Sequence, residues 1–156
     1  MPRRVEKTMY KNILIATDGS ELATRGLSHG LELAKTLNIP VTVVTTTETW
    51  SVSDIARETE HRNPNPIAQY EDIVAEASKL ILASAKEAAE QLGVSCECVH
   101  VADRHPAEGI LETATSKGCN LIVMASHGRR GVKKALLGSV ANEVLSNSAV
   151  PVLIIR

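Results

Sequence analysis

Short runs of apolar residues alternate along the chain with longer segments in which apolar positions recur every three or four residues. The short runs, rich in β-branched residues, predict buried strands, and the longer period predicts amphipathic helices. The expected strands are residues 11–17, 41–46, 94–101, 121–125 and 150–155. The expected helices are residues 21–37, 67–93, 105–118 and 139–147. This alternation predicts a single-domain α/β fold in which a parallel sheet carries helices on both faces.

Residues that commonly begin and end helices mark several of these boundaries. Ser20 is the expected N-cap of the helix 21–37, and Asn38 and Pro40 end that helix. Gly93 suits the position just after the helix 67–93. Between strand 41–46 and that helix, residues 48–67 are polar and without a clear period, which predicts a long loop. The expected inner stripe of the helix 67–93 is Ile73, Ala77, Leu80, Ser84, Ala88 and Leu92.

Composition narrows the class of protein. The 156 residues are 44% hydrophobic and 22% charged, which is ordinary for a folded globular chain and excludes whole-chain disorder. Three aromatic residues, Tyr10, Trp50 and Tyr70, are too few for a base-stacking nucleic-acid surface. The formal net charge of -1 favours neither nucleic acid nor a membrane surface, and the apolar runs are too short to span a bilayer. We therefore expect no nucleic-acid or membrane partner.

The N-terminal residues and the cysteines indicate the cellular compartment in which the protein is expected to act. Residues 1–8 are expected to form a flexible tail, basic but without the apolar segment of a secretory signal, ahead of one domain at 9–156. Three cysteines cannot all pair, which favours a reducing cytoplasm. Cys96, Cys98 and His100 alternate on one face of a strand and could suggest a metal site. Structural zinc usually needs four ligands at turn-type spacing, so buried core thiols are the favoured interpretation and no metal site is expected.

The loop after strand 121–125 has the chemistry of a phosphate site. Residues 125–139 contain three glycines, four cations and a Gly-Ser pair at the start of a helix. Backbone N–H groups in close approach and a helix N-terminus both favour a bound phosphate. The cations are Arg129, Arg130, Lys133 and Lys134. The loop matches neither the P-loop nor the dinucleotide fingerprint, and glycines that merely turn the chain beside a solvated basic face remain an equal alternative.

Three motifs resemble the universal stress proteins. They are Asp18-Gly-Ser after the first strand, Met124-Ala-Ser-His-Gly with the later pair Gly138-Ser139, and the terminal Pro151-Val-Leu-Ile-Ile. The resemblance covers residues 9–156. Nucleotide-binding members of that family carry Gly-x2-Gly-x9-Gly-Ser/Thr, which this chain matches at its last three positions. It departs at the first, where Ala125 stands in place of glycine.

The resemblance implies a five-stranded sheet in the order 3-2-1-4-5, a homodimer, and ATP or another adenine nucleotide, with Mg²⁺ or Mn²⁺ on its phosphates. Asp18 would lie at the adenosine end, although it could instead cap a helix, and the backbone of Thr46 would meet adenine. The glycines and Ser139 would surround the phosphates. The full set of implied nucleotide-binding residues is Asp18, Thr46, Ala125, Ser126, His127, Gly128, Arg129, Gly138, Ser139, Val140 and Ala141. The dimer is expected through residues 150–155, an apolar strand at the sheet edge.

The expected function is therefore that of an ATP-type stress-response module that acts by binding a ligand. The alternative is a dimeric interaction module that binds no nucleotide, and Ala125 keeps it open. A nucleotide-transforming enzyme would need a catalytic lysine or acid, which the sequence does not identify. A Ser126-His127-Asp18 relay is disfavoured because adjacent loop residues rarely align as a triad requires. No catalytic residue is assigned, slow ATP hydrolysis is left open, and the protein partner is not identified.

Overall fold

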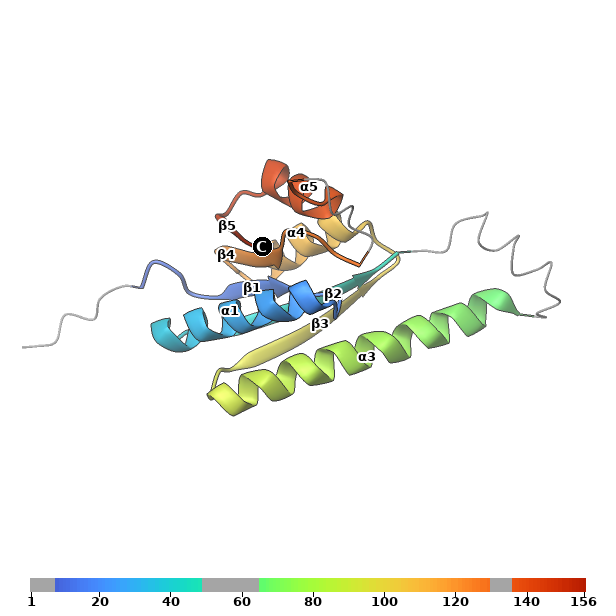
Figure 1. Ribbon diagram of the computed structural model, residues 1–156, viewed down its shortest axis with the longest axis horizontal. Helices are drawn as coiled ribbons and strands as arrows, with labels where there is room; N and C mark the ends of the chain where they lie inside the picture. Colours follow the sequence, from blue (N-terminus) through green and yellow to red (C-terminus); the bar gives the residue numbers. More distant parts are fainter. Residues whose placement is uncertain (1–7, 49–64, 130–135) are drawn as a thin grey trace, which may run out of the picture.

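The computed structural model describes residues 8–48, 65–129 and 136–156 of the chain. Its strands are β1 (Ile13–Ala16), β2 (Val41–Thr47), β3 (Cys96–Ala102), β4 (Leu121–Ala125) and β5 (Val152–Ile155). Its helices are α1 (Glu21–Leu37), α3 (Pro66–Leu92), α4 (Pro106–Ser116) and α5 (Ser139–Asn147). Within these residues the strands form one parallel sheet in the order β3-β2-β1-β4-β5 (Figure 1). The expected α/β class and strand order are confirmed.

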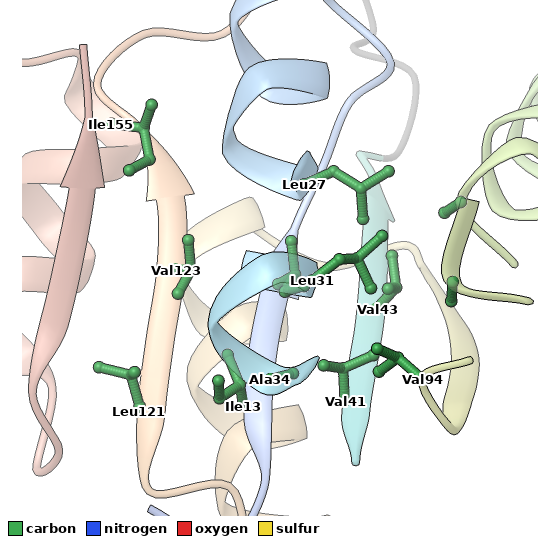
Figure 2. Packing of buried hydrophobic residues seen from close by; sticks show 13 residues of the cluster. Ile13, Leu27, Leu31, Ala34, Val41, Val43, Val94, Leu121, Val123 and Ile155 are labelled. Atoms are coloured by element: carbon green, nitrogen blue, oxygen red, sulfur yellow. The ribbon is translucent and has the colours of Figure 1, made fainter. Parts of the chain in front are cut away.

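The two faces of the sheet are covered by different helices. Ile13 and Ile15 of β1 face α1 and α3 and belong to one core cluster, part of which Figure 2 shows. Leu14 and Ala16 point the other way, into a second cluster beneath α4 and α5. All four side chains are buried, as the uniformly apolar sequence of the strand predicts. Each buried Ile or Leu contributes about 1.5–3 kcal/mol, so β1 anchors both layers of the core.

Helix α1 begins and ends where its sequence predicts. The hydroxyl of Ser20 accepts a hydrogen bond from the backbone N–H of Ala23, which makes Ser20 the N-cap. Asn38 ends the helix in the left-handed conformation, with φ of 54°. Asparagine tolerates that conformation better than most residues, which explains why the helix stops there. Four residues, 17–20, separate the end of β1 from the start of α1, and this turn lies at the carboxyl edge of the sheet.

The predicted inner stripe of α3 is correct for Ala88 and Leu92, which are partly buried and pack against the core cluster, and wrong by one position along the helix before them. Ile73 and Leu80, expected inside, are 61% and 66% exposed. The buried positions are Ser78, Ala85 and Ala89, with Val74, Ile81, Leu82, Ala88 and Leu92 partly covered. A shift of one residue rotates a helix face by about 100°, and apolar residues stand on both stripes. Hydropathy alone therefore could not choose between them.

Three other expectations need correction or fall outside the described residues. Cys96 and Cys98 are half-buried and pack against the core cluster, while His100 is exposed, so the prediction of buried core thiols on this strand face is met only in part. The last strand begins at Val152, two residues later than expected, after Pro151. The expected loop and tail fall largely on residues 49–64 and 1–7, which lie outside the described part of the chain. None of the described helices has the length and apolar character needed to cross a membrane.

Candidate functional site

A cavity of about 630 Å³ opens at the carboxyl edge of the sheet, above β1, β2 and β4. β1 and β4 are neighbours in the sheet but are not consecutive in the chain, so the connections leave them in opposite directions. Ligands of open α/β sheets bind at such a point of divergence. β1 pairs with β2 only as far as Val44, whereas β2 continues to Thr47, so Thr46 lines the cavity beyond the end of the β1 ladder.

The structure brings the expected site residues together around this cavity. Eleven residues implied by the resemblance line it: Asp18, Thr46, Ala125, Ser126, His127, Gly128, Arg129, Gly138, Ser139, Val140 and Ala141. They come from β2, from the turn after β1, from β4 and the loop after it, and from the first turn of α5. Three of the four loop cations, Arg130, Lys133 and Lys134, lie outside the described residues. The fourth loop cation, Arg129, lies in the described part of the chain and lines the cavity.

Asp18 joins the two loops that form the floor of the cavity. Its Oδ1 accepts a hydrogen bond from the backbone N–H of Ser20 at 2.9 Å, and its Oδ2 accepts one from the backbone N–H of Arg129 at 2.8 Å. Ser20, and not Asp18, is the N-cap of α1. Burial acts to raise the pKa of Asp18, but the hydrogen bonds from Ser20 and Arg129 and the Arg129 charge outweigh it and hold that pKa below its usual value. Asp18 is thus held as a carboxylate in the folded protein.

Two glycines of the loop after β4 are required by the protein's own atoms. A Cβ on Gly128 would lie 2.7 Å from Oδ2 of Asp18, and a Cβ on Gly138 would lie 3.0 Å from the carbonyl oxygen of Ser126. The backbone N–H of Gly138 donates to that same carbonyl at 2.6 Å, which brings the two ends of the loop together. The sequence predicts that these two glycines contact phosphate. The structure adds a constraint that acts before any ligand binds: a side chain at Gly128 would crowd Asp18 in the turn after β1, and one at Gly138 would crowd the Ser126 carbonyl at the other end of the loop.

The start of α5 presents backbone donors to the cavity. Gly138 is its N-cap residue and makes no side-chain capping bond, unlike Ser20 of α1. Ser139, Val140 and Ala141 form the first turn and line the cavity. The first N–H groups of a helix have no partner within the helix and carry its positive partial charge. An anion placed here would therefore be stabilised by N–H groups, the Ser139 hydroxyl and the helix dipole together.

Ser126 and His127 hold the beginning of the loop. The hydroxyl of Ser126 lies 3.0 Å from Nδ1 of His127, and its backbone N–H donates to the carbonyl of Ile155 on β5. Ser126 is only 2% exposed. Both oxygens of Asp18 accept backbone N–H groups. This arrangement suits a fixed loop better than a nucleophile with its base.

The wall formed by α3 was missed by the sequence argument. Tyr70, Val74, Ser78 and Ile81 line the cavity, and so do His105, the N-cap residue of α4, and Ile110 within α4. The error in the α3 stripe hid this wall, because Val74, Ser78 and Ile81 each lie one position after a residue predicted to face the core. A usable signal was Tyr70, one of three aromatic residues in a chain without phenylalanine. Apolar and aromatic side chains on this wall give the cavity a surface that suits a flat ring.

Residues 9–156 match the family model described as the universal stress protein family. The universal stress protein YxiE of Bacillus subtilis is 34% identical over 153 residues, which covers 95% of this chain and 100% of YxiE. The solved structure of MJ0577, a universal stress protein of Methanocaldococcus jannaschii, has a TM-score of 0.75 at 28% identity and covers 95% and 96% of the two chains.

Two further solved structures hold adenine nucleotides. A universal stress protein in complex with cAMP has a TM-score of 0.68 at 22% identity, covering 96% of this chain and 98% of its own. A universal stress protein of Archaeoglobus fulgidus in complex with dAMP has a TM-score of 0.65 at 21% identity, covering 96% and 100%. At these identities the likeness is one of fold.

Proposed function

The chain belongs to the universal stress protein family, and on that premise we propose that it binds an adenine nucleotide of the ATP type in the cavity above β1, β2 and β4. The main support for this proposal is that the N-terminus of α5 and the glycine-containing loop after β4 line the same cavity at the carboxyl edge of the sheet. Solved relatives in complex with cAMP and dAMP support an adenine ring as the ligand's base. The protein then acts as a ligand-dependent regulatory module of the stress response.

The nucleotide would lie with its phosphates at α5 and its base toward β2 and α3. The phosphates would meet the Ser139 hydroxyl and the first N–H groups of α5, beside the guanidinium of Arg129. Adenine would lie against the backbone of Thr46, on the side of β2 that β1 leaves unpaired beyond Val44. Tyr70, on the α3 wall of the cavity, would lie close to the adenine ring. Among the described residues, no group of three or more His, Cys, Asp or Glu side chains could hold a metal ion. A Mg²⁺ or Mn²⁺ ion would therefore be held mainly by phosphate oxygens.

The cell context and the assembly form part of the same proposal. Cys96, Cys98 and Cys119 are free, which fits the reducing cytoplasm. β5 is an edge strand whose Leu153 is 40% exposed, so we expect two copies to pair through it. A homodimer of this kind would hold two nucleotide sites.

The direct test is to ask whether a nucleotide accompanies the protein. Protein purified without added nucleotide would be denatured, and the released small molecules identified by mass spectrometry. Stripped protein would then be titrated calorimetrically with ATP, ADP and AMP in the presence of Mg²⁺, with GTP as the matched control. We expect one adenine nucleotide per chain and weaker binding of GTP. Absence of released nucleotide together with no heat from any adenine nucleotide would refute the proposal.

A further inference from the structure

Two thiols converge on the edge strand of the sheet, away from the cavity. The Sγ atoms of Cys96 and Cys98 lie 3.8 Å apart on the same face of β3, which is the outermost strand on its side. Both side chains are half-buried and pack against the core cluster beneath α3. Cys98 Sγ also lies 3.6 Å from the carbonyl oxygen of Leu82 on α3. Neither cysteine is among the described residues that line the cavity.

The strand geometry decides what such a pair can do. A disulfide needs its two Cβ atoms within about 3.5–4.5 Å of each other. Residues two apart on a strand have Cα atoms about 6.6 Å apart, which is near the upper end of the range of about 4.4–6.8 Å that disulfides span, so a Cys96–Cys98 bond would strain the ladder between β3 and β2. An atom bound to both sulfurs needs less change, because two sulfurs about 2.3 Å from one atom stand about 3.3–3.8 Å apart for bond angles between about 90° and the tetrahedral value. The spacing therefore favours a bound centre over a sulfur–sulfur bond.

The chemistry of the two thiols favours a soft, thiophilic ligand atom that is fully bound by two sulfur ligands. Burial, with the charge and hydrogen bond of Cys98, raises the pKa of Cys96 to about 12, while Lys86 acts to lower it and Glu90 to raise it. At so high a pKa the Cys96 thiol keeps its proton at neutral pH. Hard metal ions, and alkylating reagents that form one bond to a thiolate, therefore react with it poorly. In the described part of the chain, no third His, Cys, Asp or Glu side chain completes a metal-binding group with these thiols. Soft centres gain most from thiolate ligands, and a trivalent arsenical with one organic substituent takes two thiolates as its full set.

We propose that Cys96 and Cys98 form a dithiol site for soft thiophilic centres of the class of monosubstituted trivalent arsenicals. In the binding step two arsenic–sulfur bonds form and the arsenic–oxygen bond of the arsenoxide breaks. The two thiol protons leave with the arsenic-bound oxygen as one water molecule, and arsenic and sulfur keep their oxidation states. Binding also removes the S–H donor that faces the carbonyl of Leu82. The site is independent of the nucleotide proposal, since it uses residues outside the cavity.

The test uses phenylarsine oxide and intact-protein mass spectrometry on the reduced full chain. We expect one phenylarsenic group per chain, which survives desalting and is removed by a small dithiol but not by the same concentration of a monothiol. Cys96→Ser and Cys98→Ser should each abolish the stable adduct. Cys119→Ser is the matched control and should retain it, because Cys119 is a buried thiol outside the pair.

A second measurement on the unmodified sequence removes any dependence on how the variants fold. Trypsin cleaves after Lys86 and Arg104, so Cys96 and Cys98 fall in one peptide and Cys119 falls in another. The phenylarsenic group should remain on the peptide 87–104, and saturating ATP should not change its yield. No stable adduct, an adduct on the Cys119 peptide, or an adduct retained by both single-serine variants would each overturn the proposal.

Discussion

The Oδ2 atom of Asp18 accepts a 2.8 Å hydrogen bond from the backbone N–H of Arg129, a residue 111 positions later in the chain. The other carboxylate oxygen accepts the N–H of Ser20 at the start of α1. One side chain therefore fixes the turn after β1 against the loop after β4, across the two strands where the sheet topology diverges. Hydrogen bonds to a charged group are the stronger kind, so this carboxylate determines much of the shape of the cavity floor.

Replacing Asp18 by Asn should destabilise the fold in a pH-dependent way. The amide keeps one acceptor but turns an N–H donor toward one of the two backbone N–H groups. We expect the free energy of unfolding to fall by about 1–3 kcal/mol at neutral pH. Because the folded pKa of Asp18 lies below 3.8, its stabilising effect is present above that pH and is lost as the pH falls through the folded value. Urea denaturation at about pH 7 and about pH 3 should show the gap between parent and variant closing in acid. An equal gap at both pH values would contradict this role.

Gly128 and Asp18 should be energetically coupled. Gly128→Ala places a Cβ 2.7 Å from Oδ2 of Asp18, so this variant should lose stability in the parent background. In an Asp18→Ala background the obstructing oxygen is absent, and the same change should cost less. A double-mutant cycle measured by urea denaturation isolates the difference, which we expect to be about 0.5–3 kcal/mol. Simple additivity of the two changes would mean that the contact does not restrict residue 128.

Sequence reasoning was most accurate where a local signal and the packing agree. Ser20 and Asn38 gave the ends of α1 through capping chemistry, which depends on neighbouring residues alone. The face of α3 was missed because Ile73 and Leu80 form an apolar stripe as regular as that of Val74 and Ile81. The choice between them depends on where β2 and β3 lie beneath the helix, which is information from distant parts of the chain. The hydrogen bonds of Asp18 were hidden for the same reason.

Two glycines of α1 should respond oppositely to the same substitution. Gly26→Ala adds a Cβ whose nearest neighbour, the backbone nitrogen of Ala125, is 3.6 Å away, an ordinary contact. This change should raise the free energy of unfolding by up to about 1 kcal/mol through helix propensity. Gly30→Ala places its Cβ 2.6 Å from Cδ1 of Ile15, a fully buried side chain that would have to shift within the core. It should lower stability by about 1–3 kcal/mol. Thermal and urea unfolding of the pair checks both signs, and stabilisation by both changes would show that Ile15 repacks freely.

The proposed dimer should depend on the exposed residue of the edge strand. Leu153→Lys puts a charge on β5 and should convert the dimer to monomer at micromolar concentration in light scattering. Leu80→Lys is the matched control, since Leu80 is also an exposed leucine but lies on α3. It should leave the dimer intact. A monomeric parent protein at the same concentration, or dissociation by the control variant alone, would exclude pairing through β5.

The phosphate end of the proposed nucleotide site rests on the first turn of α5. Gly138→Val brings a side chain against the Ser126 carbonyl and the His127 backbone, which should shift the start of α5 and abolish ATP binding. Ser139→Ala removes a hydroxyl that can donate to a phosphate oxygen while leaving the backbone in place. It should weaken ATP binding by about 1–3 kcal/mol, which is about fivefold to about 150-fold in Kd. Calorimetric titration of ATP with Mg²⁺ into each folded variant measures both effects.

The control lies at the other end of the same helix. The Ser146 hydroxyl bonds the carbonyl of Asn142 within α5, so Ser146→Ala changes the helix without changing its first turn and should bind ATP like the parent. Ala125→Gly restores the glycine of the family motif and should leave affinity unchanged or raise it, because a smaller residue stands beside the same loop. Parent-like affinity in both Gly138→Val and Ser139→Ala would move the phosphates away from α5. Binding by Ala125→Gly with none by the parent would instead favour the module that binds no nucleotide, with the methyl group of Ala125 as the cause.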